Sequence, residues 1–150
     1  MDNCFVACGC DDYEGITKSD LDRFTDKIEN VLNDERGRKL FRNFMHTCKM
    51  NAGRRVLGVW EHIERLLNYK ETAESGSRTH SNYLDDVYLL LDKTDGIDEL
   101  DFATRERLTT ALAADNKEGI EEGLQLLKVE TTKALRREYN DFKKHFIPPK

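Results

Sequence analysis

The sequence predicts an all-α fold, a single-domain bundle of seven or eight helices. The chain has 150 residues, enough for one domain with a hydrophobic core and too few for two ordinary ones. It contains 2 prolines and 9 glycines, so it is poor in the turn residues that a many-stranded β fold needs. After residue 18 its apolar residues recur at intervals of three and four, which is the period of amphipathic helices.

In the N-terminal half, residues 1–18 show no helical period and are predicted to form a flexible tail. A first helix follows, with Thr17 or Ser19 as its N-cap. Gly37 is predicted to separate it from a second helix, and residues 51–53 separate the second from a third over residues 54–69. The apolar faces of these helices are formed by Leu21, Phe24, Ile28, Val31 and Leu32, by Leu40, Phe41, Phe44, Met45 and Cys48, and by Val56, Leu57, Trp60, Ile63, Leu66 and Leu67.

In the C-terminal half, two polar stretches are predicted to be connections, residues 70–81 and residues 92–101. A helix lies between them and stops near Asp92, and a short helix begins at Thr104. One long helix then runs from Lys117 toward the end of the chain, where two prolines stop it. The sequence therefore predicts a tail over residues 1–18 and one helical domain over residues 19–147.

Composition argues against several classes of protein. The chain has 24 Lys and Arg against 29 Asp and Glu, a net charge of -5, whereas non-specific nucleic-acid binding needs a basic face. No apolar run approaches the roughly 18 residues of a membrane-spanning helix. The N-terminus lacks a secretory signal, and the cysteines are not spaced like a disulfide framework. We therefore expect a cytoplasmic protein with reduced thiols.

The histidines and the loop motifs indicate no enzyme site. No pair among His46, His62, His80 and His145 has the HExxH spacing of a helical zinc site. The sequence also lacks GxGxxG and GxxxxGK[ST] phosphate loops and a GxSxG nucleophile elbow. His62 is expected to be solvated or half-buried, and Cys48 is expected to be an inert thiol in the core. We predict no catalytic residue, no cofactor and no bound metal.

Three cysteines lie close together near the N-terminus, at Cys4, Cys8 and Cys10. They are compatible with an unstructured tail carrying incidental thiols. They are also candidate S-acylation sites, which would attach the domain to the periphery of a membrane. Zinc binding is a third alternative, although the spacing lacks the CxxC ligand pair.

Two acidic segments, residues 14–24 and 92–102, resemble the calcium loops of EF-hand proteins. An EF-hand loop has oxygen ligands at positions one, three, five and twelve and glycine at position six. Counted from Asp92, the glycine comes at position five, and position three is Thr94. In the first segment the isoleucine directly follows the glycine, whereas the EF-hand isoleucine lies two residues after it. The mismatches favour acidic turns and N-caps, and a degenerate EF-hand-like calcium-binding helical protein is the alternative function.

Four segments in order carry a resemblance to one family. They are GRKLFRNFM (residues 37–45), VLGVWEHIERL (56–66), LDFATRERLTTAL (100–112) and IEEGLQLLKVETTKALRREYNDFKKHF (120–146). They resemble the opening glycine-phenylalanine motif, the aromatic-acidic helix, the short helix after an acidic loop and the closing helix pair of the regulator-of-G-protein-signalling (RGS) homology domain. The tryptophan helix, with arginines ahead of it, is nearer to the versions in receptor kinases. The resemblance covers residues 20–147 and implies a bundle of seven to nine helices.

The resemblance also implies a function. Members of the family bind activated Gα subunits, and the members that accelerate GTP hydrolysis hold the Gα switch regions in their transition-state shape. The implied partner is therefore a heterotrimeric G-protein α subunit or another protein. The family's bundle packs the helix over residues 54–69 antiparallel to the following one and brings its two chain ends to the same side.

The family's contact positions can be located by counting back from Trp60 and from Phe142. They fall on Arg55, Val56, Arg137 and Asp141. The family has glutamate and asparagine at the first two of these positions, and aspartate and arginine at the last two. Because charge is altered or reversed at most of them, and a valine side chain forms no hydrogen bond, GTPase acceleration by the family's ordinary mechanism is not expected.

Overall fold

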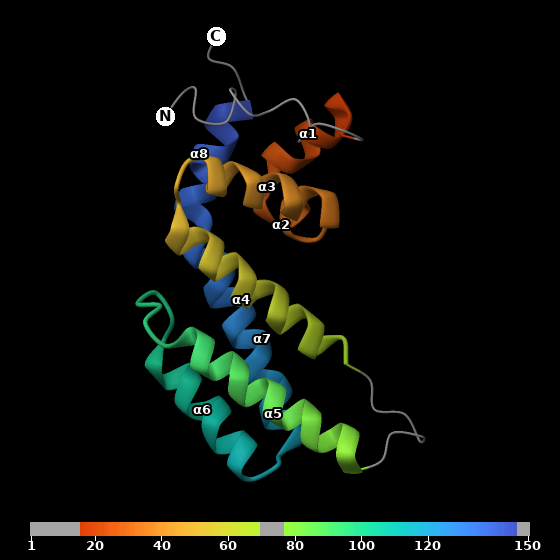
Figure 1. Cartoon of the computed structure of the whole chain (residues 1–150), viewed down its shortest axis with the longest axis vertical. Coiled ribbons are helices and arrows are strands. Elements are labelled where there is room, and N and C mark those ends of the chain that lie inside the picture. The colour runs from red at the N-terminus through yellow and green to blue at the C-terminus, as the bar shows by residue number, and fades with distance from the viewer. Residues whose placement is uncertain (1–15, 70–76, 147–150) are drawn as a thin grey trace. The chain divides into compact units, whose positions relative to one another are not determined.

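The computed structural model describes residues 16–69 and 77–146, and within these ranges it is all-helical, as predicted (Figure 1). Eight helices follow one another in the described residues, and no strand is found among them. Their bounds are α1 Lys18–Asp26, α2 Ile28–Leu32, α3 Glu35–Thr47, α4 Asn51–Leu67, α5 Ser77–Thr94, α6 Phe102–Ala113, α7 Lys117–Ala134 and α8 Arg136–Phe146.

The chain divides into two compact units. The first unit is formed by residues up to Arg55 together with residues from Leu135 onward. It contains α1, α2, α3, the start of α4, and α8. The second unit, Val56–Ala134, contains the rest of α4 with α5, α6 and α7. The single domain over residues 19–147 stays a prediction.

In the first unit, α1 begins at the predicted N-cap Thr17. The Thr17 hydroxyl accepts a hydrogen bond from the Asp20 backbone N–H at 3.1 Å, and the Asp20 carboxylate accepts from the Thr17 N–H at 3.0 Å. Such a capping box satisfies two N–H groups that a helix start leaves without intrahelical partners. The apolar stripe of residues 21–32 predicts one helix, but the structure breaks it at Lys27, which has the extended backbone φ -142°, ψ 142°.

Gly37 was predicted to separate two helices, and this is wrong. It lies inside α3, whose N-cap is Asp34. A Cβ atom added at Gly37 would lie 2.7 Å from the Val31 carbonyl oxygen of α2 and 3.1 Å from the Phe24 ring of α1. The glycine is therefore needed because three helices approach one another closely at this point.

The core of the first unit is a cluster of aromatic rings from α3 and α8. The Phe142 ring lies 5.3 Å from Phe41 and 5.7 Å from Phe44 between ring centres, both in edge-to-face geometry. The Tyr139 hydroxyl donates a hydrogen bond of 2.7 Å to the backbone oxygen of Phe24 in α1. Burial raises the pKa of Tyr139 to about 12, so the phenol keeps the proton that it donates. The closing helix is thus fixed to α1 and α3.

In the second unit, α4 and α5 run antiparallel (Figure 1). The rings of Tyr69, just after α4, and Tyr83, near the start of α5, stack with 4.6 Å between their centres. Elsewhere along the same two helices, His62 of α4 contacts Asp86 of α5. On α7, the backbone at Gly123 lies close to α6, because an added Cβ would be 3.0 Å from a Leu108 methyl group. These contacts order the four helices of the unit.

Trp60 is the largest fully buried side chain of the second unit, with 1% of its surface exposed. Its indole N–H donates to the Thr132 hydroxyl of α7 at 3.2 Å, so the one polar atom of the ring has a partner. The Lys128 ammonium lies 5.5 Å from the ring centre and forms an ion pair of 2.7 Å with Glu64. The tryptophan stripe is therefore core, as predicted.

Several predicted helix boundaries are wrong. Residues 51–53 were predicted as a break, but they form the first turn of α4. The predicted loop over residues 70–81 overlaps α5, which begins at Ser77; residues 70–76 lie outside the described residues. The single long helix predicted from Lys117 is two helices, because α7 ends at Ala134 and α8 begins at Arg136.

Candidate functional site

The predicted partner-binding residues lie on α4 and α8. Arg55 is exposed, and Arg137 has 81% of its side chain exposed. Asp141 is half-buried. Val56 has only 5% of its surface exposed and belongs to the second unit, whereas the other three belong to the first. Three of the four predicted residues are thus in part accessible to a partner.

The first turns of α4 and α8 lie side by side in the first unit. A Cβ added at Gly53 would lie 2.8 Å from the Cγ atom of Glu138. The Glu138 side chain is buried, and one of its oxygens is 3.5 Å from Arg137. Its other oxygen is buried without a hydrogen-bond partner among the described residues. The neighbouring Arg137 side chain, in contrast, is exposed to solvent.

Arg54 belongs to the same turn of α4, and its orientation is fixed by two hydrogen bonds. One guanidinium nitrogen donates to His46 Nδ1 at 2.7 Å, and the other donates to the Asn51 side-chain oxygen at 2.8 Å. Because His46 accepts at Nδ1, its proton lies on Nε2. This end of the first unit therefore presents ordered cationic groups, an arrangement suited to docking an anionic surface.

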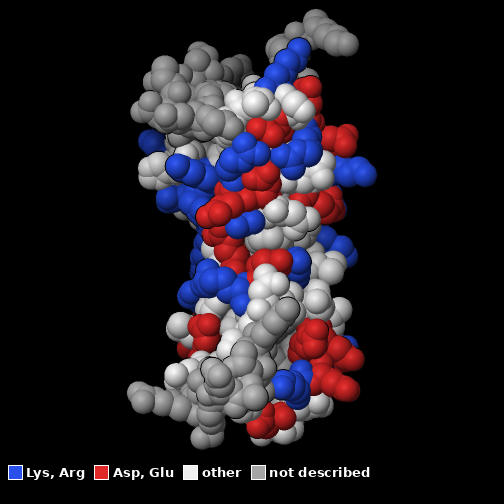
Figure 2. Space-filling view, turned by 90° about the vertical axis from the view of Figure 1, so that its right-hand side faces the viewer, with Lys and Arg blue, Asp and Glu red and all other residues white. Residues whose placement is uncertain are grey.

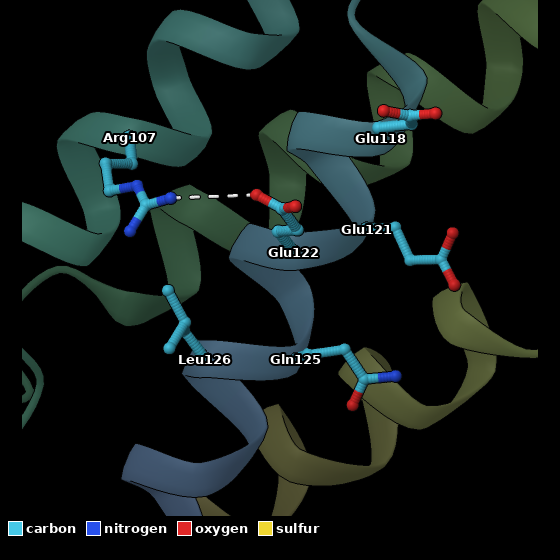
Figure 3. Close-up of a pocket in the computed structure, with 6 residues that line it drawn as sticks. All are labelled: Arg107, Glu118, Glu121, Glu122, Gln125 and Leu126. Atoms are coloured by element: carbon cyan, nitrogen blue, oxygen red, sulfur yellow. Dashed lines mark ion pairs between the residues drawn. The ribbon is translucent and has the colours of Figure 1, made fainter.

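On the second unit, a shallow pocket of about 550 Å³ lies between α6 and α7 (Figure 3). Glu122 turns toward Arg107, with 3.7 Å between carboxylate and guanidinium, whereas Glu121 points away from that pair. Both members of the ion pair are about two-thirds exposed, and such pairs contribute little to stability. The open, solvated pocket holds its carboxylates apart and offers no arrangement for acid–base chemistry.

A second groove of the same unit, about 630 Å³, lies between α5 and α6. Two aromatic side chains line it and are unusually exposed, Phe102 at 68% and Tyr88 at 44%. Charged residues surround them: Asp92, Asp95, Arg105 and Glu106. Apolar surface within a charged rim is typical of protein contact sites. The sequence pattern does not predict this groove, because Tyr88 fits the helical stripe and Phe102 stands alone before α6.

His62 was expected to be solvated or half-buried, and this is wrong: only 1% of its surface is exposed. Its Nε2 atom lies 2.8 Å from Asp86, and the Lys93 ammonium lies 3.2 Å from Nδ1. Because lysine can only donate, Nδ1 accepts, and Nε2–H donates to Asp86. Burial, opposed by Asp86 and assisted by Lys93 and Arg65, lowers the pKa of His62. The ring is a neutral polar link between α4 and α5.

We expect the second unit to lose stability as the pH falls from about 7.5 to about 5.5. An unfolded histidine takes up a proton near pH 6.5, whereas folded His62, with its lowered pKa, resists protonation. Its contribution is therefore intact above the unfolded pKa and is lost as the pH falls below it, by at most about 1.4 kcal/mol per pH unit. Urea unfolding of wild type and His62→Gln across this range measures the effect.

His62→Gln should flatten the dependence of the unfolding free energy on pH, because it removes the buried imidazole. Equal slopes in wild type and His62→Gln would contradict the assignment.

An ion-pair network joins the starts of α1 and α3. Arg23 contacts both Asp20, at 3.2 Å, and Asp34, at 3.1 Å. Arg36 contacts the same two carboxylates. The backbone N–H of Thr17 and the two arginines hold the pKa of Asp20 well below its usual range. Figure 2 shows Lys and Arg side chains interspersed with Asp and Glu side chains on one face of the molecule. The network orders the two helix starts.

The acidic segment of residues 92–102 has a different structure from a calcium loop. Asp92 lies in the last turn of α5, Gly96 has φ 85°, and Asp101 is the N-cap of α6, accepting from the Ala103 N–H. The prediction of acidic turns and N-caps is confirmed for Asp101. Across residues 16–69 and 77–146, no group of three or more His, Cys, Asp or Glu side chains is placed to hold a metal ion.

The cysteine predictions fall on two parts of the chain. Cys4, Cys8 and Cys10 lie outside the described residues. Cys48 was predicted to be a reduced core thiol, but it is half-buried at the C-cap of α3 and is disulfide-bonded. Among the described helices, none is long and apolar enough to span a bilayer.

Comparison of the chain with family models, with curated proteins and with solved structures gave no match.

Proposed function

We propose that the chain is a signalling interaction domain of the RGS-homology type, which binds a Gα subunit or another protein by surface complementarity. The observation that supports this most is the helix arrangement. Helices from both chain ends form one unit, in which Tyr139 of α8 donates to Phe24 of α1. The tryptophan helix α4 is antiparallel to α5. Both features are expected of an RGS-type bundle.

The accessible surface gives further support to a docking role. Arg55 and Arg137 are exposed cations at the family's contact positions. The aromatic groove with Tyr88 and Phe102 adds exposed apolar surface on the second unit. Aromatic and arginine side chains supply much of the binding energy in protein interfaces.

The proposed domain binds without accelerating GTP hydrolysis. Val56 stands where the family has its asparagine, and only 5% of its surface is exposed. A buried aliphatic side chain cannot donate the hydrogen bond that orders the Gα switch residues. Binding would then occlude the Gα surface instead of completing its catalytic site.

The direct test is capture of the chain by Gα subunits of each class, loaded either with GDP or with GDP and aluminium fluoride. We expect capture by at least one class, and no increase in its single-turnover GTP hydrolysis. The double variant Arg55→Glu, Arg137→Glu should weaken capture at least tenfold, because it reverses two charges at the proposed contact.

The matched control is Arg65→Glu, which reverses one exposed charge elsewhere on α4. It should leave capture unchanged within about twofold. Failure of every Gα class to capture the chain would reject the Gα proposal.

A further inference from the structure

The two units carry opposite charge, which the overall value of -5 conceals. In the first unit, residues 16–55 and 135–146 contain 14 Lys and Arg against 8 Asp and Glu, a net charge of +6. In the second unit, residues 56–69 and 77–134 contain 8 against 15, a net charge of -7. The negative net charge of the whole chain therefore does not disfavour a polyanionic partner of the first unit.

Four of the 14 cations of the first unit lie on α8, and the other ten lie in residues 16–55. The apolar side of this helix is buried, with Phe142 at 0% and Tyr139 at 4% exposed. Residues 136, 140 and 144 follow one another at intervals of four, so they form a stripe on the opposite side. We define the basic face as the three exposed cations of α8, Arg136, Arg137 and Lys144. Lys143 is half-buried, and its ammonium lies 5.5 Å from the ring centre of Tyr139.

The carboxylates near the basic face neutralise it only in part. Arg136 lies 3.8 Å from Glu29, but both side chains are 56% exposed. Arg137 lies 3.5 Å from Glu138 and still has 81% of its side chain exposed. Ion pairs that are this long and this exposed are weak, so other anions can replace the carboxylates at these arginines. Asp141 is the one other carboxylate on α8.

We propose that the basic face binds the surface of anionic phospholipid membranes. Residues 136–144 of a helix extend over about 12 Å, so their cations can contact several headgroups at once. Each Lys or Arg held at an anionic leaflet strengthens binding about fivefold. The second unit, with its charge of -7, is repelled by the same surface. The first unit is therefore the part of the chain that we expect to contact the lipid, through α8.

A membrane fits these observations better than a nucleic acid does. Proteins that bind single strands without sequence preference stack bases on exposed aromatic rings. Among the residues that the structure describes, the exposed large apolar side chains all belong to the second unit.

The test is sedimentation of the full, unacylated chain with vesicles, which measures the electrostatic contribution alone. We expect binding to vesicles of phosphatidylcholine with about 30% phosphatidylserine at about 0.05 M salt, and release at about 0.5 M. The double variant Arg136→Glu, Lys144→Glu should lower the partition coefficient at least tenfold. Neither residue is among the proposed Gα contacts, so the two proposals can fail separately.

The matched control is Arg65→Glu, Lys133→Glu, which changes the net charge equally but on the second unit. It should leave partitioning within about twofold of wild type, and circular dichroism should show both double variants folded. Equal loss in the two variants, or equal binding to pure phosphatidylcholine, would overturn the proposal. Tighter binding to a duplex of about 20 base pairs than to the vesicles would overturn it in favour of a nucleic acid.

Discussion

Gly37→Ala is expected to lower the free energy of unfolding by about 2 kcal/mol. The new Cβ would lie 2.7 Å from the Val31 carbonyl oxygen and 3.1 Å from the Val31 Cα atom. Both are backbone atoms, which cannot rotate away as a side-chain end can, so α2 and α3 must separate. The higher helix propensity of alanine, worth about 1 kcal/mol, offsets part of a larger steric cost. Urea denaturation monitored by circular dichroism measures the change.

Gly58→Ala is the matched control, because Gly58 also lies inside a helix but a Cβ there meets nothing within 4 Å. It should raise the free energy of unfolding by about 0.5–1 kcal/mol, since alanine restricts the unfolded chain more than glycine does. The two substitutions are chemically identical, so their difference isolates the helix contact. Equal effects would show that α2 and α3 do not approach closely at Gly37.

The same glycine illustrates what sequence reasoning can and cannot predict. A glycine inside a helical pattern is locally a breaker, so a prediction from the sequence places a boundary there. Its actual role depends on Val31 and Phe24, which are adjacent to it only in the folded unit. The apolar residues on either side were nevertheless assigned correctly to the core, because burial of a helical stripe follows from its period.

The two missed breaks have a common physical cause. Lys27 separates α1 from α2, and Leu135 separates α7 from α8, yet neither position has a glycine or proline. Propensity is a weak local preference that tertiary packing overrides, so no residue type marks these ends. The second break coincides with the boundary between the two units. The helical structure of these segments was predictable from the sequence, whereas the points where one helix ends and the next begins were not.

The residues of the candidate sites also differ in how far the sequence predicts their positions. Val56 could be assigned to a helix stripe, and its burial agrees with that assignment. The burial of His62 could not be predicted, because its partners Asp86 and Lys93 come from another helix. The basic face could have been detected from the sequence, since residues 136–144 contain four cations against two carboxylates. Averaging charge over the whole chain removed that signal.

Phe142→Ala is expected to have the largest effect of any single substitution considered, a loss of about 3–5 kcal/mol. The ring is fully buried and contacts Phe41, Phe44 and Phe146, with ring centres 5.3, 5.7 and 4.8 Å away. Truncation removes the ring and leaves a cavity that its rigid aromatic neighbours can fill only in part. The loss should appear in thermal melts as a lower midpoint and in urea titrations as a lower free energy of unfolding.

Phe102→Ala is the control, because Phe102 is 68% exposed at the start of α6. The same truncation there should change the free energy of unfolding by less than about 0.5 kcal/mol. If Phe102→Ala matched Phe142→Ala, the assignment of one ring to the core and the other to the surface would be wrong. If Phe142→Ala alone were mild, α8 would not be packed on α3, and the basic face on the outer side of α8 would lose its structural support.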